Sequence, residues 1–220
     1  MIRGLLFDLD GVLIHSELWH QKLNIRCLKD LGCSDIDPKV FYYTIGSGKG
    51  SDPWDRIYEE IPGRYRECGF KETFKAYKAK QFVYPPFSEI VFPDVKNSLA
   101  KLKSEGYQLA CCSSSRIDYI ETALSDCGIA DLFDLIISGH DFTRSKPDPE
   151  IYLAAMNRLS MNCDECVVIE DSVYGIQAGK NAGMVVVARR DRDFGLDQSQ
   201  ADYLIDSLDE MDDILNKLNR

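Results

Sequence analysis

The second part of the chain alternates short apolar runs with amphipathic segments, and this alternation limits the fold more than any other feature. Runs with the composition of strands are separated, from Val95 onward, by stretches with helical periodicity. Such alternation is typical of a parallel sheet covered by helices, so we expect an α/β fold with a Rossmann-like core. The expected strands are Ile2–Phe7, Tyr107–Cys112, Leu132–Ser138, Cys166–Glu170, Met184–Ala188 and Tyr203–Ile205. The expected helices of this part are Val95–Ser104, Ile117–Cys127, Glu150–Leu159, Val173–Ala182 and Leu208–Leu218.

About eighty residues separate the first expected strand from the rest of this series. Residues 16–88 are rich in Lys, Tyr, Phe and Glu at helical spacing and carry no strong strand pattern. The stiff segments Pro85–Pro86 and Phe92–Pro93 suit the return of the chain to the core. We therefore expect a core domain made of residues 1–15 and 89–220, with a helical cap domain inserted at residues 16–88.

The overall charge and composition exclude several classes of partner. The 220-residue chain has 36 acidic and 26 basic residues, a formal net charge of −10, which disfavours nucleic acid and anionic membranes. No apolar run approaches the ~18 residues that a membrane span requires, and the first residues do not resemble a secretory signal. We expect a soluble, cytoplasmic protein with reduced cysteines, a monomer or weak homo-oligomer. A phosphorylated substrate would be repelled unless a metal ion and a lysine reversed the local potential.

Polar residues that directly follow apolar strands mark the expected site, because ligands of such sheets bind at the carboxyl ends of the strands. Asp8 and Asp10 follow the first expected strand, and Gly11 permits a sharp departure of the backbone. Two carboxylates this close in sequence favour a bound cation. The alternative is that both acids merely terminate the strand.

Two further segments are suited to holding an anion. Ser113 and Ser114 follow a strand and open a helix, where hydroxyls and backbone N–H groups bind anions, although serines also cap helices. Lys146 lies just before a helix between prolines and would hold a phosphoryl group as a point charge, although an isolated lysine is more often solvated.

Adjacent acids end another buried strand. Glu170 and Asp171 follow the run Val167–Ile169, and hard oxygen ligands of this kind suit Mg²⁺. An acidic pocket like that of a signalling receiver domain is the rival interpretation.

Taken in this order, the four segments resemble the haloacid dehalogenase-like superfamily, in the phosphatase and β-phosphoglucomutase branch with a helical cap inserted after the first motif. The resemblance covers nearly the whole chain. It is carried by FDLDGVL at residues 7–13, SKPDPEIY at residues 145–152 and IEDSVYGIQAGKNAGM at residues 169–184, with the serine segment in support.

The resemblance implies a role for each core residue. Asp8 would be the nucleophile that forms an aspartyl-phosphate, and Asp10 would be the general acid and base. Ser113, Ser114 and Lys146 would hold the phosphoryl oxygens.

The resemblance also implies a Mg²⁺ cofactor. Asp8, Asp171 and the backbone carbonyl of Asp10 would surround the ion, and Glu170 would either bind it directly or orient its water. Asp10 argues against an actual dehalogenase, which has no leaving alkoxide to protonate.

Two histidines lie near the expected start of the cap. His15 stands where the family pattern has an aspartate before the Ser or Thr, and its role stays open. His20 lies one helical turn after Ser16 and resembles a cap histidine of β-phosphoglucomutases, the alternative being a packing role.

The remaining cap candidates are a loop and a helix. Gly46 and Lys49 fall in the segment that resembles the family's specificity loop, although a plain connecting loop is equally consistent. The pattern there is not a phosphate-binding Walker motif, because two of its positions are missing. Lys75 and Lys78 lie on an expected helix, Lys71–Phe82, where either lysine would contact substrate or face solvent.

The expected function is that of a Mg²⁺-dependent phosphatase acting on a small phosphorylated metabolite, a sugar phosphate being the expected class. A phosphosugar mutase of the β-phosphoglucomutase type is the first alternative. A noncatalytic, receiver-like phospho-acceptor or binding module is an alternative of another class.

Overall fold

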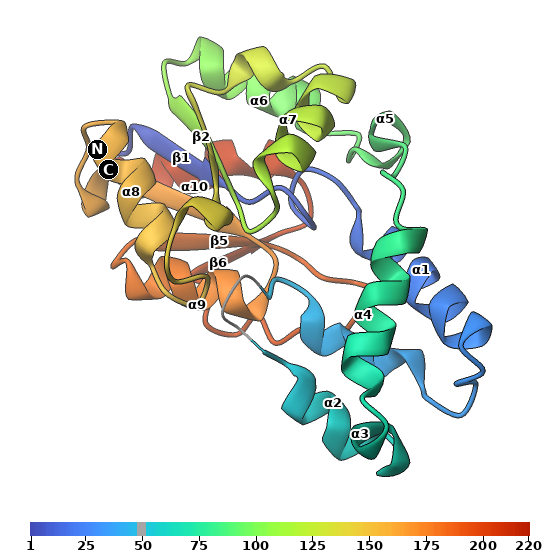
Figure 1. The fold of residues 1–220 in the computed structure, drawn as a ribbon. Helices are drawn as coiled ribbons and strands as arrows, with labels where there is room; N and C mark the ends of the chain where they lie inside the picture. Colours follow the sequence, from blue (N-terminus) through green and yellow to red (C-terminus); the bar gives the residue numbers. More distant parts are fainter. Residues whose placement is uncertain (48–51) are drawn as a thin grey trace.

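The computed structural model describes residues 1–47 and 52–220, which form one parallel sheet, the helices that cover it, and a separate group of helices (Figure 1). The strands are β1 (Gly4–Phe7), β2 (Gln108–Ser113), β3 (Leu135–Ser138), β4 (Cys166–Glu170), β5 (Val185–Arg189) and β6 (Tyr203–Ile205). Their order in the sheet is β3-β2-β1-β4-β5-β6, and every neighbouring pair is parallel. The predicted α/β fold with a Rossmann-like core is confirmed.

Alternation along each strand divides the core between the two faces of the sheet. Leu5 and Phe7 of β1 point to one face, and Leu6 points to the other. The first face is covered by α6 (Val95–Ser104), α7 (Ile117–Asp126) and α10 (Met211–Leu218), and the second by α8 (Glu150–Arg158) and α9 (Val173–Asn181). Because both faces are buried, the strands are continuous apolar runs with polar residues only at their ends, rather than alternating apolar and polar residues.

Two predicted boundaries differ from the structure for a local reason. The strand expected from Leu132 begins only at Leu135, because Ala130–Leu132 forms a 3-10 turn. The last predicted helix begins with another 3-10 turn, Leu208–Glu210, whose first residue follows the capping Ser207. Further 3-10 turns lie at Gly139–Asp141 and Cys163–Glu165.

The helices between β1 and α5 form a group with its own apolar interior, which we call the cap helices. They are α1 (Glu17–Asp30), the 3-10 helix Pro38–Thr44, α2 (Trp54–Glu60), α3 (Arg64–Glu67) and α4 (Phe70–Gln81). Their interior is built from aromatic and aliphatic side chains, among them Phe41, Trp54 and Phe74. Figure 1 shows α1 and α4 running beside each other, apart from the sheet.

The two segments that join the cap helices to the sheet pair with each other. Ile14 and Val91 form an antiparallel bridge, and the His15 amide donates to the carbonyl of Ile90 at 2.8 Å. The short helix α5 (Phe87–Ile90) lies in the second segment, and its Phe87 packs into the core beside the sheet. The two segments are therefore tied together close to the carboxyl end of β1.

The chain ends lie near each other, and the Ile2 amide donates to the Asn219 side chain at 2.6 Å (Figure 1). All eight cysteines are free thiols. Across residues 1–47 and 52–220, no helix combines the length and the apolar character needed to cross a bilayer.

Candidate active site

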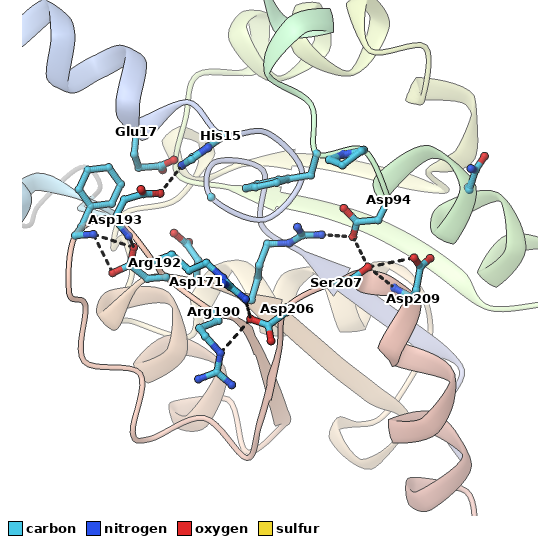
Figure 2. Close-up of a pocket in the computed structure, with 17 residues that line it drawn as sticks. His15, Glu17, Asp94, Asp171, Arg190, Arg192, Asp193, Asp206, Ser207 and Asp209 are labelled. Atoms are coloured by element: carbon cyan, nitrogen blue, oxygen red, sulfur yellow. Dashed lines mark hydrogen bonds and ion pairs between the residues drawn. The ribbon is translucent and has the colours of Figure 1, made fainter.

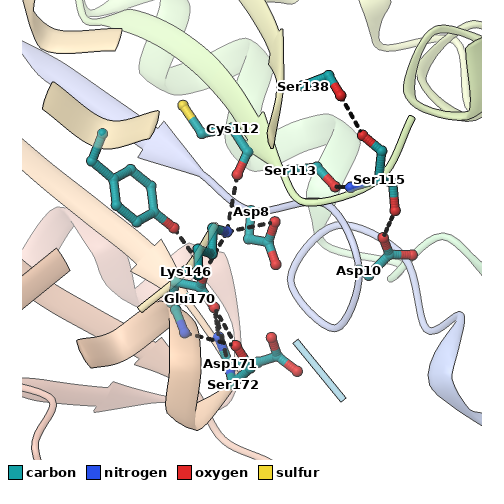
Figure 3. A network of polar contacts seen from close by, with 12 residues as sticks. Asp8, Asp10, Cys112, Ser113, Ser115, Ser138, Lys146, Glu170, Asp171 and Ser172 are labelled. Carbon is teal, nitrogen blue, oxygen red and sulfur yellow. Dashed lines mark hydrogen bonds and ion pairs between the residues drawn. The ribbon is translucent and has the colours of Figure 1, made fainter. Parts of the chain in front are cut away.

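Three strands bring the predicted core residues to one edge of the sheet. Phe7 of β1 is in register with Cys111 of β2 and Ile169 of β4, so the residues that follow these strands lie side by side. The Asp8 amide donates to the carbonyl of Ile169 at 2.9 Å. Figure 3 shows Asp8 between the residues that follow β2 and those that follow β4.

Lys146 is the cation at the centre of this edge, with 2% of its surface exposed. Its Nζ lies 3.0 Å from Asp8 Oδ1 and 2.6 Å from Glu170 Oε1, and it donates to the Cys112 carbonyl at 3.0 Å. Burial alone would lower the pKa of Lys146, but the charges of Asp8 and Glu170 outweigh burial and raise it. Lys146 therefore keeps its positive charge next to Asp8.

Both carboxylate oxygens of Glu170 are occupied by donors from the protein. Oε1 accepts from Lys146 and from the Tyr152 hydroxyl at 2.7 Å. Oε2 accepts from the amides of Asp171 and Ser172 at 3.0 and 3.3 Å, and from the Ser172 hydroxyl at 3.2 Å. Burial would raise the pKa of Glu170, but Lys146 lowers it. This arrangement favours an orienting role for Glu170 over the direct metal contact that the sequence left open.

The donor set around Asp8 fits a divalent cation. One carboxylate oxygen each from Asp8, Glu170 and Asp171 lie within 4.8 Å of one another, and all three residues are buried. Burial raises the pKa of Asp8 to about 7, and burial together with Glu17 and Glu170 raises that of Asp171 well above its usual range. Lys146 is the one cation that contacts this cluster within residues 1–47 and 52–220. Clustered carboxylate oxygens with excess negative charge suit Mg²⁺, which prefers hard oxygen ligands.

The Asp10 carboxylate is turned away from this cluster and is held by three hydroxyl groups. The hydroxyls of Ser16, Ser115 and Tyr119 donate to it, the last two at 2.8 and 3.2 Å. Figure 3 shows Asp10 directed toward Ser115. Ser16 immediately precedes α1, so one of these contacts links Asp10 to the cap helices. None of the three donors was singled out from the sequence as a partner of Asp10.

The predicted phosphate-binding serines lie at the end of β2, where Ser113 is the last residue of the strand and Ser114 follows it. Ser113 is buried, and its hydroxyl accepts the Ser115 amide at 3.1 Å. The Ser115 carbonyl in turn accepts the Ser138 hydroxyl at 2.6 Å, which fixes this loop to the end of β3. Ser113 and Ser114, like Asp8, line a cleft between the sheet edge and the cap helices.

A cleft of about 290 Å³ separates the sheet edge from the cap helices. Its core wall carries Asp8, Asp10 and Ser113 to Ser115. Its cap wall carries Glu17, His20, Gln21, Asn24, Thr44, Ile45, Gly46, Ser47 and Lys78. A volume near the lower end of the usual range for ligand pockets suits a small metabolite.

The predicted cap residues are only partly brought to the cleft. His20 and Gly46 line it, and burial lowers the pKa of His20, whose ring stacks on Phe82. Lys75 does not belong to the lining of the cleft: it is exposed, and its Nζ lies over the Trp54 ring, 5.9 Å from the ring centroid. Among the lysines of the described residues, Lys78 lines the cleft. Lys49 lies outside the described residues.

A larger cavity of about 590 Å³ is lined in part by the two segments that join the cap helices to the sheet (Figure 2). Glu17 and Asp171 reach its wall, but Asp8 and Asp10 do not belong to its lining. His15, whose role the sequence left open, lies here: its Nε2 is 3.0 Å from Asp193 Oδ2, and its ring stacks on Phe92. The smaller cleft, which contains both aspartates, is therefore the candidate active site.

Comparison with known proteins agrees with this geometry. A family model described as haloacid dehalogenase-like hydrolase matches residues 5–189. The phosphoglycolate phosphatase of Aquifex aeolicus is 30% identical over 182 residues, covering 83% of this chain and 82% of the relative. The phosphoglycolate phosphatase of Colwellia psychrerythraea is 29% identical over 189 residues, covering 82% of this chain and 80% of the relative.

A solved structure is similar to this chain over its whole length. The crystal structure of β-phosphoglucomutase from Clostridium difficile is 26% identical in sequence and has a TM-score of 0.74, covering 100% of this chain and 98% of that one. The matched family region contains all three core motifs and the residues that line the cleft. The chain therefore belongs to the haloacid dehalogenase-like hydrolase family and is an enzyme of that family.

Proposed function

We propose that the protein is a Mg²⁺-dependent phosphatase that hydrolyses a small phosphorylated metabolite through an aspartyl-phosphate on Asp8. The observation that carries this proposal is the buried contact of Asp8 with Lys146 beside Glu170 and Asp171, at the wall of a cleft. The relatives named phosphoglycolate phosphatase support a phosphate ester as substrate. Residues 16–88 would act as the cap domain over a core of residues 1–15 and 89–220.

In the first step, the Asp8 carboxylate attacks phosphorus, and the bond from phosphorus to the ester oxygen breaks. Asp10 gives its proton to the departing oxygen, so the alcohol leaves neutral. Lys146 and the hydroxyls of Ser113 and Ser114 hold the phosphoryl oxygens during this transfer. Asp10 must exchange at least one of its present hydroxyl partners to reach the leaving group.

In the second step, a water molecule attacks the phosphorus of the aspartyl-phosphate. Asp10, now ionised, accepts a proton from this water, and the bond between phosphorus and Asp8 breaks. Inorganic phosphate leaves, and Asp8 returns as a carboxylate and Asp10 as an acid. Asp10 therefore gives up one proton in the first step and regains one in the second.

Asp8 and Asp171, with the Asp10 carbonyl that the family resemblance implies, would hold Mg²⁺. When bound, the ion neutralises charge on the phosphoryl group and favours the ionised form of Asp8. Glu170 would orient Lys146 and the backbone amide of Asp171 rather than contact the ion, because both its oxygens already accept hydrogen bonds.

A phosphomutase is the second candidate, favoured by the likeness to β-phosphoglucomutase and by the position of His20 in the cleft. A mutase would return the phosphoryl group to another hydroxyl instead of to water. A noncatalytic phospho-acceptor is disfavoured by the cleft itself, since the cap wall is unnecessary for simple acceptance of a phosphoryl group.

The test follows p-nitrophenyl phosphate hydrolysis with Mg²⁺ and with a chelator, in the wild type and in Asp8→Asn, Asp10→Asn and Asp131→Asn. We expect activity to need Mg²⁺ and Asp8, and turnover of Asp10→Asn to fall about 10²- to 10⁴-fold while a phosphorylated protein is detected by mass spectrometry. Asp131 is an exposed control. Undiminished phosphate release by Asp10→Asn would contradict the role of Asp10.

A hexose 1-phosphate assay separates the two candidates. Phosphate and isomerised product are both measured over time. Formation of the isomerised product without release of phosphate would show that the protein is a mutase and not a phosphatase.

A further inference from the structure

A row of polar side chains on α1 faces the cleft, although apolar residues usually occupy such a buried helix face. Glu17, Gln21 and Asn24 follow one another at positions i, i+4 and i+7, so they lie on one side of the helix. They are 8%, 8% and 1% exposed, and all three line the cleft. Buried polar groups are normally hydrogen-bonded, so this row requires an explanation.

Two members of this row have acceptor atoms without a partner. Gln21 Oε1 and Asn24 Oδ1 are fully buried, and neither receives a hydrogen bond from the described part of the protein. A buried amide oxygen without a partner is unfavourable, because it has lost its hydrogen bonds to water and gained none from the protein. An amide both donates and accepts, as a hydroxyl does, so hydroxyl groups of a ligand in the cleft are suitable partners.

Lys78 adds a positive charge to the same wall. It comes from α4, is half-buried, and lines the cleft beside the amides. Among the ion pairs of residues 1–47 and 52–220, none involves Lys78, whereas the neighbouring Lys71 pairs with Asp52. Burial lowers the pKa of Lys78, and an anion bound next to it would offset this effect. A cation that has no counter-ion in a cleft is suited to a charged ligand.

We propose that Gln21, Asn24 and Lys78, here called the cap wall triad, bind the end of the substrate that is remote from the transferred phosphate. That end carries hydroxyl groups, which pair with the two amides, and a second oxyanion, either a carboxylate or another phosphate, which pairs with Lys78. The substrate class is then a phosphorylated sugar acid or a sugar bisphosphate of a few carbons. This inference rests on the proposed function, since it assumes that Lys146 and Ser113 hold the transferred group.

The test compares substrates that differ only at the remote end. The first pair is 6-phosphogluconate and sorbitol 6-phosphate, and the second is 3-phosphoglycerate and glycerol 3-phosphate. Fructose 1,6-bisphosphate and fructose 6-phosphate form the pair with a second phosphate. We expect the wild type to prefer the anionic member of at least one pair by about 10- to 100-fold in kcat/KM, the range of one charged hydrogen bond.

Substitutions on α4 test whether this preference depends on Lys78. In Lys78→Met the preference should fall by the same 10- to 100-fold, whereas Lys75→Met should retain it, because Lys75 lies on the same helix but outside the cleft. Asn24→Leu should lower kcat/KM for the hydroxylated substrates relative to p-nitrophenyl phosphate. Circular dichroism shows whether each variant is folded, and the wild-type preference does not depend on any variant.

The outcomes separate this inference from the proposed function. Preference for the acids identifies a carboxylate, and preference for the bisphosphate identifies a second phosphate. Hydrolysis of p-nitrophenyl phosphate without a preference in any pair overturns the inference alone, as does a preference that survives Lys78→Met. Failure to hydrolyse any phosphate ester with Mg²⁺ overturns the proposed function.

Discussion

Asp8 is a buried carboxyl group whose protonation we expect to contribute to the pH dependence of stability in the metal-free protein. It is 6% exposed, and burial outweighs the attraction of Lys146 and raises its pKa from 3.8 to about 7. In the unfolded chain the same carboxyl titrates near ~3.9. Between these two values the folded protein holds a proton that the unfolded chain has lost. The contribution of Asp8 to stability is therefore complete below about pH 4 and is lost as the pH rises through 7.

The size of this effect follows from the shift. About three pKa units correspond to about 4 kcal/mol once both states are ionised, of which about 3 kcal/mol is lost between pH 5 and pH 8. Asparagine has nearly the same shape as aspartate and cannot lose a proton. The free energy of unfolding of Asp8→Asn, minus that of the wild type, should accordingly grow by about 3 kcal/mol from pH 5 to pH 8 in the presence of a chelator.

The assay is equilibrium unfolding in urea at each pH, followed by circular dichroism. Trp19 and Trp54 both lie in the cap helices, so their fluorescence reports on that group and shows whether it unfolds together with the sheet. Mg²⁺ favours the ionised carboxylate, so its addition should stabilise the wild type at pH 8 and flatten its pH dependence. Asp131→Asn, which removes an exposed carboxyl, should run parallel to the wild type. A difference between Asp8→Asn and the wild type that stays constant or shrinks with pH would refute the argument.

Two further substitutions test how the site is supported. Gly46 has a φ of 69°, and a side-chain carbon there would overlap the Ser172 hydroxyl. Gly46→Ala should therefore lower the free energy of unfolding by about 1 to 2 kcal/mol and raise KM. Gly63→Ala, whose added carbon meets no atom, should change neither quantity. Urea unfolding and kinetics with p-nitrophenyl phosphate measure both, and equal effects at the two glycines would disprove the contact. Tyr152→Phe removes the 2.7 Å bond to the buried Glu170 and should lower the free energy of unfolding by about 2 kcal/mol. The same change at the exposed Tyr84 should cost less than ~0.5 kcal/mol, and similar losses at the two tyrosines would count against the buried network.

The core fold, and the edge of the sheet where the site lies, could be predicted because they depend on patterns that are local in sequence. Cys166–Glu170 is an apolar run that ends in acids, and the structure gives the strand the same bounds. The rule that ligands meet the carboxyl ends of parallel strands then brings Asp8 and Asp171 together without any knowledge of side-chain packing. Boundaries failed where a single turn of 3-10 helix replaced the start of a regular element, as at Ala130–Leu132.

The orientation of side chains within the site could not be predicted in the same way. Asp10 stands two residues after Asp8, yet its carboxylate is held by Ser115 and Tyr119, which are more than a hundred residues away in the chain. Glu170 and Asp171 are adjacent, yet only Glu170 is surrounded by protein donors. Which oxygen atoms are occupied depends on contacts between elements, and no local pattern records them.

In the cap wall, the periodic pattern of buried residues on α4 distinguishes Lys78 from Lys75, a distinction that the sequence analysis did not draw. Phe70 and Phe74 are buried on α4 at positions i and i+4, and Lys78 continues this row at i+8. Lys75, the residue after Phe74, lies about 100° from Phe74 around the helix and is exposed. A lysine in line with buried aromatic residues is therefore directed to the side of α4 that meets α1, where Gln21 and Asn24 form the corresponding row. The two rows converge on the cleft, and this convergence is the reason to expect that the cap helices select the substrate by its hydroxyls and its second charge.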